Sequence, residues 1–409
     1  MSQNFLTISA KNTRDEIALL LTFGQEPCDI SARCNRRSSP HTDLTMRDLS
    51  NNNLGTSSRR DFVKGSLGLA VVSSAAFATP SAEAAPQTPT VRTAAGEGPV
   101  ITRFIPKTKE AIPAIGLGTF MTFDVEPGGK RDHLLEVTRR FWEAGGRVID
   151  TSPLYGMAEV NVGHFASKLG ITDQTFVSNK VWATGDYLGD ASQGERSLEL
   201  SLDRLWRAQI DLMQCHSLVN VDVMVPLTKA WKKEGKIKYL GVTHYETPYF
   251  APLADWVEKG DLDFVQVHYS IHTRQAEERI LQAAADQGTA VSINMPLEKA
   301  RLHKIVEGRP LPDFAKELDI QTWSAFFLKW VISNPLVTIA LPATTNPEHL
   351  DENMAALRGP LPDKEMRQRM VRHMETIPGF DKLAQMPWYP DKKFDGVISH
   401  AQKALRSRA

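Results

Sequence analysis

Cysteine is scarce in this sequence, which has three cysteines among 409 residues. So few cysteines exclude a disulfide scaffold, and their spacing suits no structural zinc site. An excess of charge of one sign is also lacking, because 48 Lys and Arg balance 48 Asp and Glu. We therefore expect no nucleic acid partner. No apolar run reaches the roughly 18 residues of a membrane-spanning helix, so we do not expect an integral membrane protein. Apolar residues make up 42% of the chain, enough for a sizeable core.

The segment 1–85 has the layout of an export signal behind a leader. A basic stretch at 57–64 (SSRRDFVK) precedes an apolar run at 65–78 and small residues at 79–85. A basic segment, a short apolar core and a small-residue cleavage site are typical of secretory signals. Arg59 and Arg60 resemble the pair of a twin-arginine (Tat) signal, which implies export to the periplasm by the Tat machinery. A buried helix with two chance arginines is the alternative. A start at Met46 would shorten the leader.

From about residue 100 the sequence alternates apolar runs with amphipathic segments. The runs predict strands at 114–120, 147–151, 175–181, 210–216, 238–243, 264–269, 290–294 and 337–341. Helical periodicity predicts helices at 131–144, 191–206, 221–234, 249–258, 274–286, 323–333 and 347–357. Eight such repeats favour a (β/α)₈ TIM barrel, which typically takes about 250 residues. A doubly wound sheet is the rival, but its usual Gly-x-Gly-x-x-Gly turn does not follow the first strand.

These patterns divide the chain into four parts. We predict a leader and signal at 1–85, a linker at 86–99, a single α/β barrel domain at 100–375 and a C-terminal tail at 376–409. The run 100–113 is expected to form a short hairpin that closes the bottom of the barrel. The tail, which contains Trp388, Tyr389 and Pro390, is expected to pack over the barrel.

Polar residues follow the predicted strands. In a (β/α)₈ barrel the chemistry lies at the carboxyl ends of the strands. The residues there are Asp150, Lys180, His216, Thr243, His244, Gln266, Asn294, Thr344 and Thr345. A lysine is rarely buried without a partner, and Asp150 ends the strand before that of Lys180. Tyr155 lies in the loop after Asp150, within reach of the barrel mouth.

These side chains suit proton transfer to an oxygen. Asp150 is expected to orient and neutralise Lys180, and Lys180 is expected to lower the pKa of Tyr155. A phenol otherwise titrates near about 10, too high for an acid at neutral pH. His216 completes a pair of donors for a carbonyl oxygen. A structural ion pair between Asp150 and Lys180 is the alternative.

Several segments resemble the aldo/keto reductase superfamily. They lie at 115–120, 148–156, 176–180, 210–216, 240–244, 264–267, 341–344 and 352–353. The resemblance is greatest to a Tat-exported branch, and it implies four catalytic residues, Asp150, Tyr155, Lys180 and His216. It also implies NADP(H) or NAD(H) as cofactor. The positions that would contact this cofactor are Thr243, His244, Gln266, Asn294, Thr344, Glu352 and Asn353.

The sequence departs from the family pattern around the cofactor. Asn294 stands where an aromatic residue usually stacks on the nicotinamide, and the loop 297–301 lacks the usual glycines. Ala343 and His349 replace the basic residues that usually clamp the 2′-phosphate. We therefore expect weak discrimination between NADPH and NADH. Lys299 and Arg301 are candidates to bind the phosphates from another direction.

The leading prediction is an NAD(P)(H)-dependent oxidoreductase that reduces an aldehyde or ketone. The alternatives are sugar-alcohol oxidation or a lyase step on the same four residues, and a nucleotide-binding sensor subunit without turnover. We expect Cys215 to pack beneath a helix, and Trp182 to form a wall of the substrate pocket. His164, His268 and His272 have no partners at metal-ligand spacing, so we predict no metal site.

Overall fold

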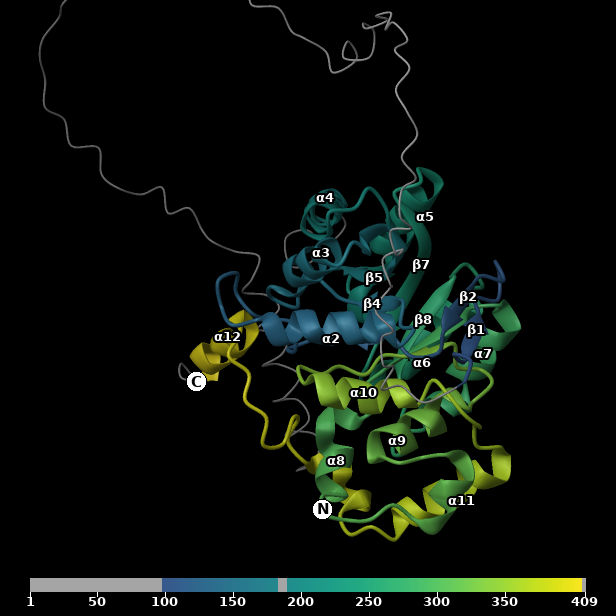
Figure 1. Cartoon of the computed structure of the whole chain (residues 1–409). Coiled ribbons are helices and arrows are strands. Elements are labelled where there is room, and N and C mark those ends of the chain that lie inside the picture. The colour runs from purple at the N-terminus through teal and green to yellow at the C-terminus, as the bar shows by residue number, and fades with distance from the viewer. Residues whose placement is uncertain (1–97, 183–189, 407–409) are drawn as a thin grey trace, which may run out of the picture. The chain divides into compact units, whose positions relative to one another are not determined.

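The computed structural model describes residues 98–182 and 190–406. The predicted leader, the Tat signal and almost all of the linker lie outside these residues. Within them, the strands of the domain run through the centre and helices surround them (Figure 1). None of the described helices is long and apolar enough to cross a membrane.

Eight parallel strands form the centre of the domain. They are β3 (Leu117–Gly118), β4 (Val148–Asp150), β5 (Phe176–Val181), β6 (Ile210–Cys215), β7 (Ile237–His244), β8 (Phe264–His268), β9 (Ala290–Asn294) and β10 (Ile339–Ala340). Each strand is bonded to the next in chain order. Parallel bridges from Ile115 to Ala340 and from Gly118 to Ala343 join the first strand to the last. The predicted (β/α)₈ arrangement is therefore confirmed, and all eight predicted strands are present.

Helices connect the strands. The helices of the connections are α2 (Asp132–Glu143), α3 (Ala158–Lys168), α4 (Ser192–Leu205), α5 (Val221–Lys233), α6 (Phe250–Glu258), α7 (Ile280–Gln287), α8 (Arg301–Ile305), α9 (Trp323–Ile332) and α10 (Pro347–Ala355). Helix α10 begins as its sequence predicts, because the Asn346 side chain accepts the backbone N–H of Glu348 at 2.8 Å and Pro347 takes the first helical position.

Helix α3 was not predicted, because polar residues occupy its buried face. Glu159 and Asn161 are both fully buried. Glu159 accepts hydrogen bonds from Asn179 and Arg204, both at 2.9 Å. Asn161 donates to the backbone oxygen of Phe123 at 2.7 Å. These bonds satisfy the polar groups inside the protein, so the helix lacks a continuous apolar stripe.

A hairpin closes the bottom of the barrel, as the sequence predicts. Strand β1 (Thr102–Phe104) pairs antiparallel with β2 (Ala111–Pro113). Ile105 and Ile112 pack in one apolar cluster with residues of the barrel strands, among them Phe176. The cluster fills the amino-terminal end of the barrel, so a cavity inside the barrel can open only at the other end.

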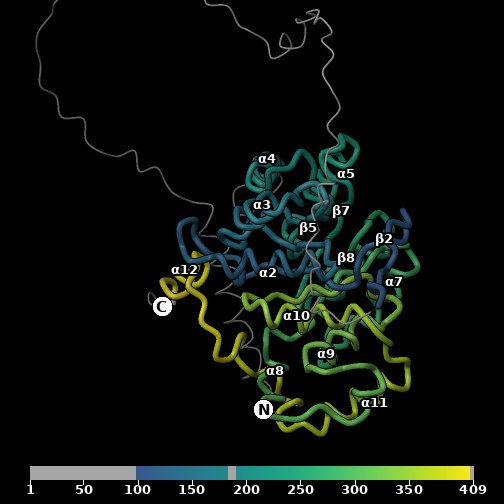
Figure 2. Tube along the Cα trace, viewed as in Figure 1, coloured from purple at the N-terminus to yellow at the C-terminus, as the bar shows by residue number. Residues whose placement is uncertain are grey.

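The C-terminal segment is more ordered than the sequence indicated. It contains helices α11 (Lys364–Glu375) and α12 (Val397–Arg406), neither of which was predicted. Figure 2 follows this yellow segment past α8 to α12. The backbone N–H of Tyr389 donates to the Lys299 oxygen at 2.9 Å. Ile398 packs against Met121, which follows β3. The tail therefore lies over the mouth of the barrel, as predicted.

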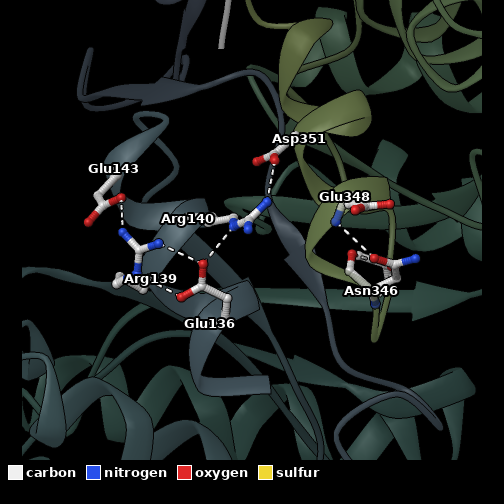
Figure 3. Close-up of polar contacts among 8 residues, drawn as sticks. Glu136, Arg139, Arg140, Glu143, Asn346, Glu348 and Asp351 are labelled. Atoms are coloured by element: carbon white, nitrogen blue, oxygen red, sulfur yellow. Dashed lines mark hydrogen bonds and ion pairs between the residues drawn. The ribbon is translucent and has the colours of Figure 1, made fainter. Parts of the chain in front are cut away.

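Charged side chains connect α2 to α10 on the outside of the barrel (Figure 3). Arg140 donates to Asp351 of α10 at 2.6 Å and to Glu136 at 2.7 Å. Hydrogen bonds from Arg139 and Arg140 lower the pKa of Glu136 to about 2. The pairs are partly exposed and add little stability individually. Their geometric effect is to fix α10, whose other residues line the cavity described next.

Candidate active site

A cavity of about 660 Å³ opens at the carboxyl ends of the strands. This volume is within the range of small-molecule sites. Nine of the predicted site residues line it: Asp150, Tyr155, His216, Thr243, Gln266, Asn294, Thr344, Glu352 and Asn353. Lys180 and His244 are not on its wall. The remaining lining comes mainly from the loops after the strands and from the C-terminal tail.

Lys180 and Asp150 form a buried ion pair beside the cavity. The Lys180 Nζ atom lies 2.7 Å from Asp150 Oδ2 and 2.8 Å from the Thr151 backbone oxygen. The side chains are 1% and 7% exposed. Burial lowers the pKa of Lys180, while the charge of Asp150 acts in the opposite direction. The pair was predicted from strands β4 and β5, which lie side by side in the sheet.

A hydrogen-bond network links Asp150 to four further strands. Asp150 Oδ1 accepts from Ser178 Oγ of β5 and from Gln266 Nε2 of β8, both at 2.8 Å. Gln214 of β6 donates to Ser178 Oγ at 3.0 Å. Thr243 of β7 donates to Gln266 Oε1 at 3.3 Å. Gln266 and Thr243 were predicted to contact the nicotinamide. In the structure Gln266 is bonded to the Asp150 carboxylate, and Thr243 is bonded to Gln266.

Sequence reasoning missed two members of this network, Ser178 and Gln214. Ser178 lies two positions before Lys180 on β5, and Gln214 lies two positions before His216, which directly follows β6. Side chains alternate along a strand, so positions two apart face the same side. A polar residue at such a position inside an apolar strand was the available signal.

Tyr155 lies over the buried ion pair. The Lys180 Nζ atom is 4.9 Å from the centre of the Tyr155 ring. The ring packs edge-on against Phe120 at 5.0 Å between centroids, and His216 lies at 5.9 Å. The structure therefore brings together all four predicted catalytic residues.

The pKa of Tyr155 is not lowered as we predicted. Burial raises this pKa well above 10, and the nearby groups Asp150 and Tyr389 act in the same direction. Burial of the phenol is the largest contribution to this pKa, so the Lys180 ammonium 4.9 Å from the ring centre does not bring it below its usual value. The phenol is therefore neutral at physiological pH and retains the proton that a general acid must donate.

His216 presents a neutral imidazole to the cavity. Burial, Lys180 and His244 hold the pKa of His216 well below 6.5. Its Nδ1 atom lies 3.3 Å from Ser152 Oγ. A neutral imidazole still has one N–H group to donate. It can therefore polarise a carbonyl oxygen without adding a positive charge to the site.

Comparison with known proteins assigns the chain to a family. The model of the Aldo/keto reductase family matches residues 114–370. The chain belongs to the aldo/keto reductase family. It is an oxidoreductase, as predicted.

Two relatives show how low the sequence identity is between this chain and other members of the family. This aldo/keto reductase is 26% identical over 300 residues to an NADH-specific methylglyoxal reductase of Escherichia coli (strain K12), covering 62% of this chain and 90% of the relative. It is 25% identical over 279 residues to probable aldo-keto reductase 1 of Glycine max, and the alignment covers 57% of this chain and 77% of the relative.

Solved structures show the same fold. An aldo-keto reductase from Klebsiella pneumoniae in complex with NADPH has a TM-score of 0.55 at 23% identity, covering 73% of this chain and 99% of that one. The holo form of a Bacillus halodurans aldo-keto reductase has a TM-score of 0.54 at 18% identity, and the match covers 67% of this chain and 96% of that one.

The loop after β9 departs from a glycine-rich loop in an unexpected way. Met295, Glu298, Lys299 and Ala300 all have positive φ angles, between 50° and 68°. Such conformations are unfavourable for residues other than glycine and persist only where the surroundings fix them. The group that fixes the loop is the carboxylate of Glu298, which is fully buried.

Glu298 is held by three side chains. His268 Nε2 lies 2.7 Å from its carboxylate, Ser270 Oγ donates at 2.6 Å, and Arg301 donates at 2.5 Å. Burial raises the pKa of Glu298, but His268, Ser270 and Arg301 outweigh it and lower the pKa overall. His268 is thus part of a buried polar cluster. The structure places the Arg301 guanidinium in this cluster, 4% exposed, and not on the cavity wall.

Lys299 lines the cavity but also meets the tail. Its Nζ atom is 2.9 Å from the centre of the Trp388 ring and 5.0 Å from that of Tyr245. This contact is a cation–π interaction, which holds the loop against the tail. The predicted phosphate role of Lys299 would compete with it.

His244 was predicted to contact the cofactor, but its ring lies elsewhere. It stacks on Tyr249 at 4.1 Å between centroids, and its Nδ1 atom accepts the Glu246 backbone N–H at 3.1 Å. Trp182, predicted as a pocket wall, is not among the lining residues. Cys215 is buried in the apolar core as predicted.

Further polar groups line or border the cavity. The Asn294 Oδ1 atom is buried and has no hydrogen-bond partner among the described residues. Ser324 donates to Glu352 at 2.8 Å and lies 3.0 Å from His303 Nε2. No three His, Cys, Asp or Glu side chains in the described part of the chain gather as metal ligands.

Proposed function

We propose that this aldo/keto reductase reduces an aldehyde or ketone to an alcohol with NADH or NADPH, and that Tyr155 donates the proton. The observation that carries the proposal is the joint placement of the Tyr155 phenol and the His216 imidazole on one cavity wall. Both groups are neutral hydrogen-bond donors in front of a buried Lys180–Asp150 pair. Such donors stabilise the negative charge that develops on a carbonyl oxygen during hydride addition.

Each residue has a separate task in this reaction. The nicotinamide, when bound, supplies the hydride. His216 donates a hydrogen bond to the carbonyl oxygen and orients it. Tyr155 transfers its phenolic proton to that oxygen. Lys180 stabilises the resulting phenolate, and Asp150 holds Lys180 in position through the 2.7 Å ion pair.

The cavity has groups that fit a nicotinamide dinucleotide. Asn294 Oδ1 is an unpaired acceptor for a carboxamide N–H. Thr344, which precedes α10, and Glu352 and Asn353 of α10 also line the cavity. The Escherichia coli relative is named for NADH and the Klebsiella structure contains NADPH, which supports a dinucleotide of either kind.

The protonation state of Tyr155 favours reduction over sugar-alcohol oxidation. Oxidation of an alcohol needs a phenolate to accept the proton, and burial raises the pKa of Tyr155. The walls around Tyr155 also favour an apolar substrate over a sugar, because Phe120, Leu154, Phe394 and Ile398 line the same cavity.

A nucleotide-consumption assay tests the proposal. The purified protein is mixed with NADH or NADPH and a panel of aliphatic, aromatic and sugar aldehydes. We expect consumption of reduced nucleotide with apolar carbonyl compounds. Binding without consumption across the panel would instead support the sensor subunit. Reduction of an oxidised nucleotide with sugar alcohols only would support sugar-alcohol oxidation.

We also propose that the protein is exported to the periplasm by the Tat machinery. The support is the sequence at 57–85, with its Arg59-Arg60 pair. Replacing both arginines by lysine keeps the charge but removes the planar guanidinium groups. We expect R59K/R60K to accumulate in the cytoplasm, whereas K107R/K109R should be exported normally. Unchanged periplasmic recovery of R59K/R60K would contradict the proposal.

A further inference from the structure

Ser152 lies against the imidazole of His216 at the edge of the cavity. We propose that the Ser152 hydroxyl holds His216 in the tautomer whose proton is on Nε2, so that the ring offers an N–H to the substrate oxygen. Ser152 is then a positioning residue that acts through His216. The assignment rests on the proposed function only for the identity of the group that receives this N–H.

The hydrogen-bond capacity of Ser152 decides the tautomer. A serine hydroxyl has one hydrogen to donate and can accept through its lone pairs. Ser152 Oγ accepts the backbone N–H of Leu154 at 3.2 Å and lies 3.3 Å from His216 Nδ1. Donation of the hydroxyl hydrogen to Nδ1 satisfies both groups and leaves the ring proton on Nε2.

The opposite arrangement leaves a hydrogen unpaired. If Nδ1 carried the proton and donated to Ser152 Oγ, the hydroxyl hydrogen would have no acceptor among the described residues. Ser152 is fully buried, so water does not reach the hydroxyl freely. A buried donor without an acceptor is unfavourable, and about a tenfold excess of the Nε2–H tautomer is a modest expectation.

The tautomer matters because His216 is neutral. Lys180 and His244 are the charged or titratable groups near its ring, and burial acts with them to lower the pKa of His216. Tyr155 faces the same ring at 5.9 Å between centroids. A neutral imidazole has a single N–H. With the proton on Nδ1, Nε2 would present a lone pair to the carbonyl oxygen. This lone pair and those of the oxygen would repel each other.

The backbone around both residues is firmly held. Ser217 and Leu218 have positive φ angles of 52° and 56°, and the Val219 N–H donates to the His216 oxygen at 3.1 Å. Before Ser152, the Thr151 N–H donates to the Ser178 oxygen at 2.8 Å. The strained turn fixes the backbone of His216. The remaining role of Ser152 is to determine which ring nitrogen of His216 carries the proton.

Nitrogen NMR of the full-length protein tests the tautomer directly. The ¹⁵N chemical shifts of a neutral imidazole differ strongly between its protonated and unprotonated nitrogens. In protein labelled with ¹⁵N-histidine, the His216 signals are those lost in His216→Asn. At pH 7.5 we expect a protonated Nε2 and an unprotonated Nδ1. A protonated Nδ1 in the wild-type protein would overturn the proposal without any variant of Ser152.

Two substitutions separate positioning from packing. Ser152→Ala should move the His216 signals toward a mixture of tautomers, and Ser152→Thr, which keeps the hydroxyl, should restore the wild-type pattern. In carbonyl reduction, kcat/KM of Ser152→Ala should fall by the same factor as the Nε2–H population. The Kd for the nucleotide, measured by calorimetry, should not change.

The outcomes are distinguishable. If Ser152→Ala lost activity while the His216 signals stayed at their wild-type positions, Ser152 would be merely structural and the proposal would be overturned. If the wild-type protein reduced no carbonyl compound while Nε2 was protonated as expected, the proposed function would fail and the tautomer assignment would stand.

Discussion

The carboxylate of Asp124 accepts the backbone N–H of Ile398 at 2.8 Å, across 274 positions of sequence. Its other oxygen accepts the N–H of Met157 at 3.0 Å, two residues after Tyr155. Two glycines make room for this carboxylate. A Cβ atom on Gly156 would lie 2.1 Å from Asp124 Oδ1, and one on Gly396 would lie 2.4 Å from Oδ2. One buried side chain thus joins the loop of the proposed general acid to the C-terminal tail.

Replacing Asp124 by Asn should loosen the tail and the Tyr155 loop together. The amide nitrogen cannot accept a hydrogen bond, so at least one of the two backbone N–H groups loses its partner. We expect a loss of about 2 kcal/mol in the free energy of unfolding, the range for hydrogen bonds to charged groups. Urea unfolding measures it, and limited proteolysis should show faster cleavage of the tail. Asp381→Asn, at an exposed site, is the matched control. Equal stability and cleavage in both variants would contradict the role of Asp124.

Gln266 and Asn294 should affect different steps. Gln266 donates to Asp150 at 2.8 Å, whereas Asn294 has an unpaired oxygen on the cavity wall. We expect Gln266→Leu to lower kcat by about tenfold or more, because the buried carboxylate loses a hydrogen bond. Its nucleotide Kd should change little.

Asn294→Ala is the counterpart and should raise the Kd for both nucleotides with little effect on kcat. Stopped-flow binding and steady-state kinetics separate the two effects. The reverse pattern, with Gln266→Leu changing only Kd, would restore Gln266 to a nicotinamide contact and contradict its place in the Asp150 network.

The protein should lose stability in mild acid because its buried histidines are held neutral. Burial lowers the pKa of His244 to about 4 and, with His349 and Lys392, that of His303 to about 4. These values lie below that of an unfolded histidine, so the unfolded chain takes up protons first as pH falls. The stabilisation is fully present above about pH 6.5 and is lost between there and about pH 4.

For His244 alone the loss between pH 7.5 and pH 5 should be about 2 kcal/mol. Urea unfolding of the wild-type protein and of His244→Asn at both values measures it. The variant should lose less stability over this interval, and His133→Asn, at an exposed site, should behave like the wild type. If the free energy of unfolding of His244→Asn changed with pH as much as that of the wild type, His244 would not be the titrating group.

Discrimination between NADPH and NADH should be weak at pH 8. Ala343 and His349 line the cavity where the sequence lacks a basic clamp, and neither side chain can form paired hydrogen bonds with a phosphate. We expect the two Kd values to lie within about tenfold of each other. His349→Arg should tighten NADPH binding by about 10- to 100-fold and leave NADH unchanged, because a guanidinium forms paired hydrogen bonds with phosphate.

Tryptophan fluorescence titration measures these affinities, with His133→Arg on the outer helix α2 as control. A preference of a hundredfold or more for NADPH in the wild-type protein would contradict the expectation. It would place the clamp on another cation of the cavity, such as Lys392 of the tail.

The grouping of the four proposed catalytic residues could be predicted from the sequence because the barrel simplifies the geometry. All carboxyl ends of parallel strands meet at one face, so Asp150, Lys180 and His216 on successive strands had to be neighbours. Tyr155 follows Asp150 closely enough to reach them. No longer-range information was needed for this part of the site.

Other features depend on contacts that leave no local pattern. The docking of the tail depends on Asp124 and Ile398, which no spacing rule connects. Arg301 was predicted as a candidate for phosphate binding, and this was wrong. Its burial against Glu298 depends on the fold of the loop, which the sequence does not reveal. Helix α3 was missed because Glu159 is paired inside the protein and not apolar. In each case a buried polar group is satisfied by a distant partner, which only the fold can supply.

Tyr155→Phe tests the central claim most directly, because it removes only the phenolic hydroxyl. The protein should fold normally and bind nucleotide with unchanged Kd. Its kcat for the best carbonyl substrate should fall by at least about 10²-fold, the usual effect of losing a positioned general acid. Tyr249→Phe, whose ring lies against His244 and not on the cavity wall, should keep wild-type kcat. Activity of Tyr155→Phe within twofold of the wild type would contradict the assignment of Tyr155 as the proton donor.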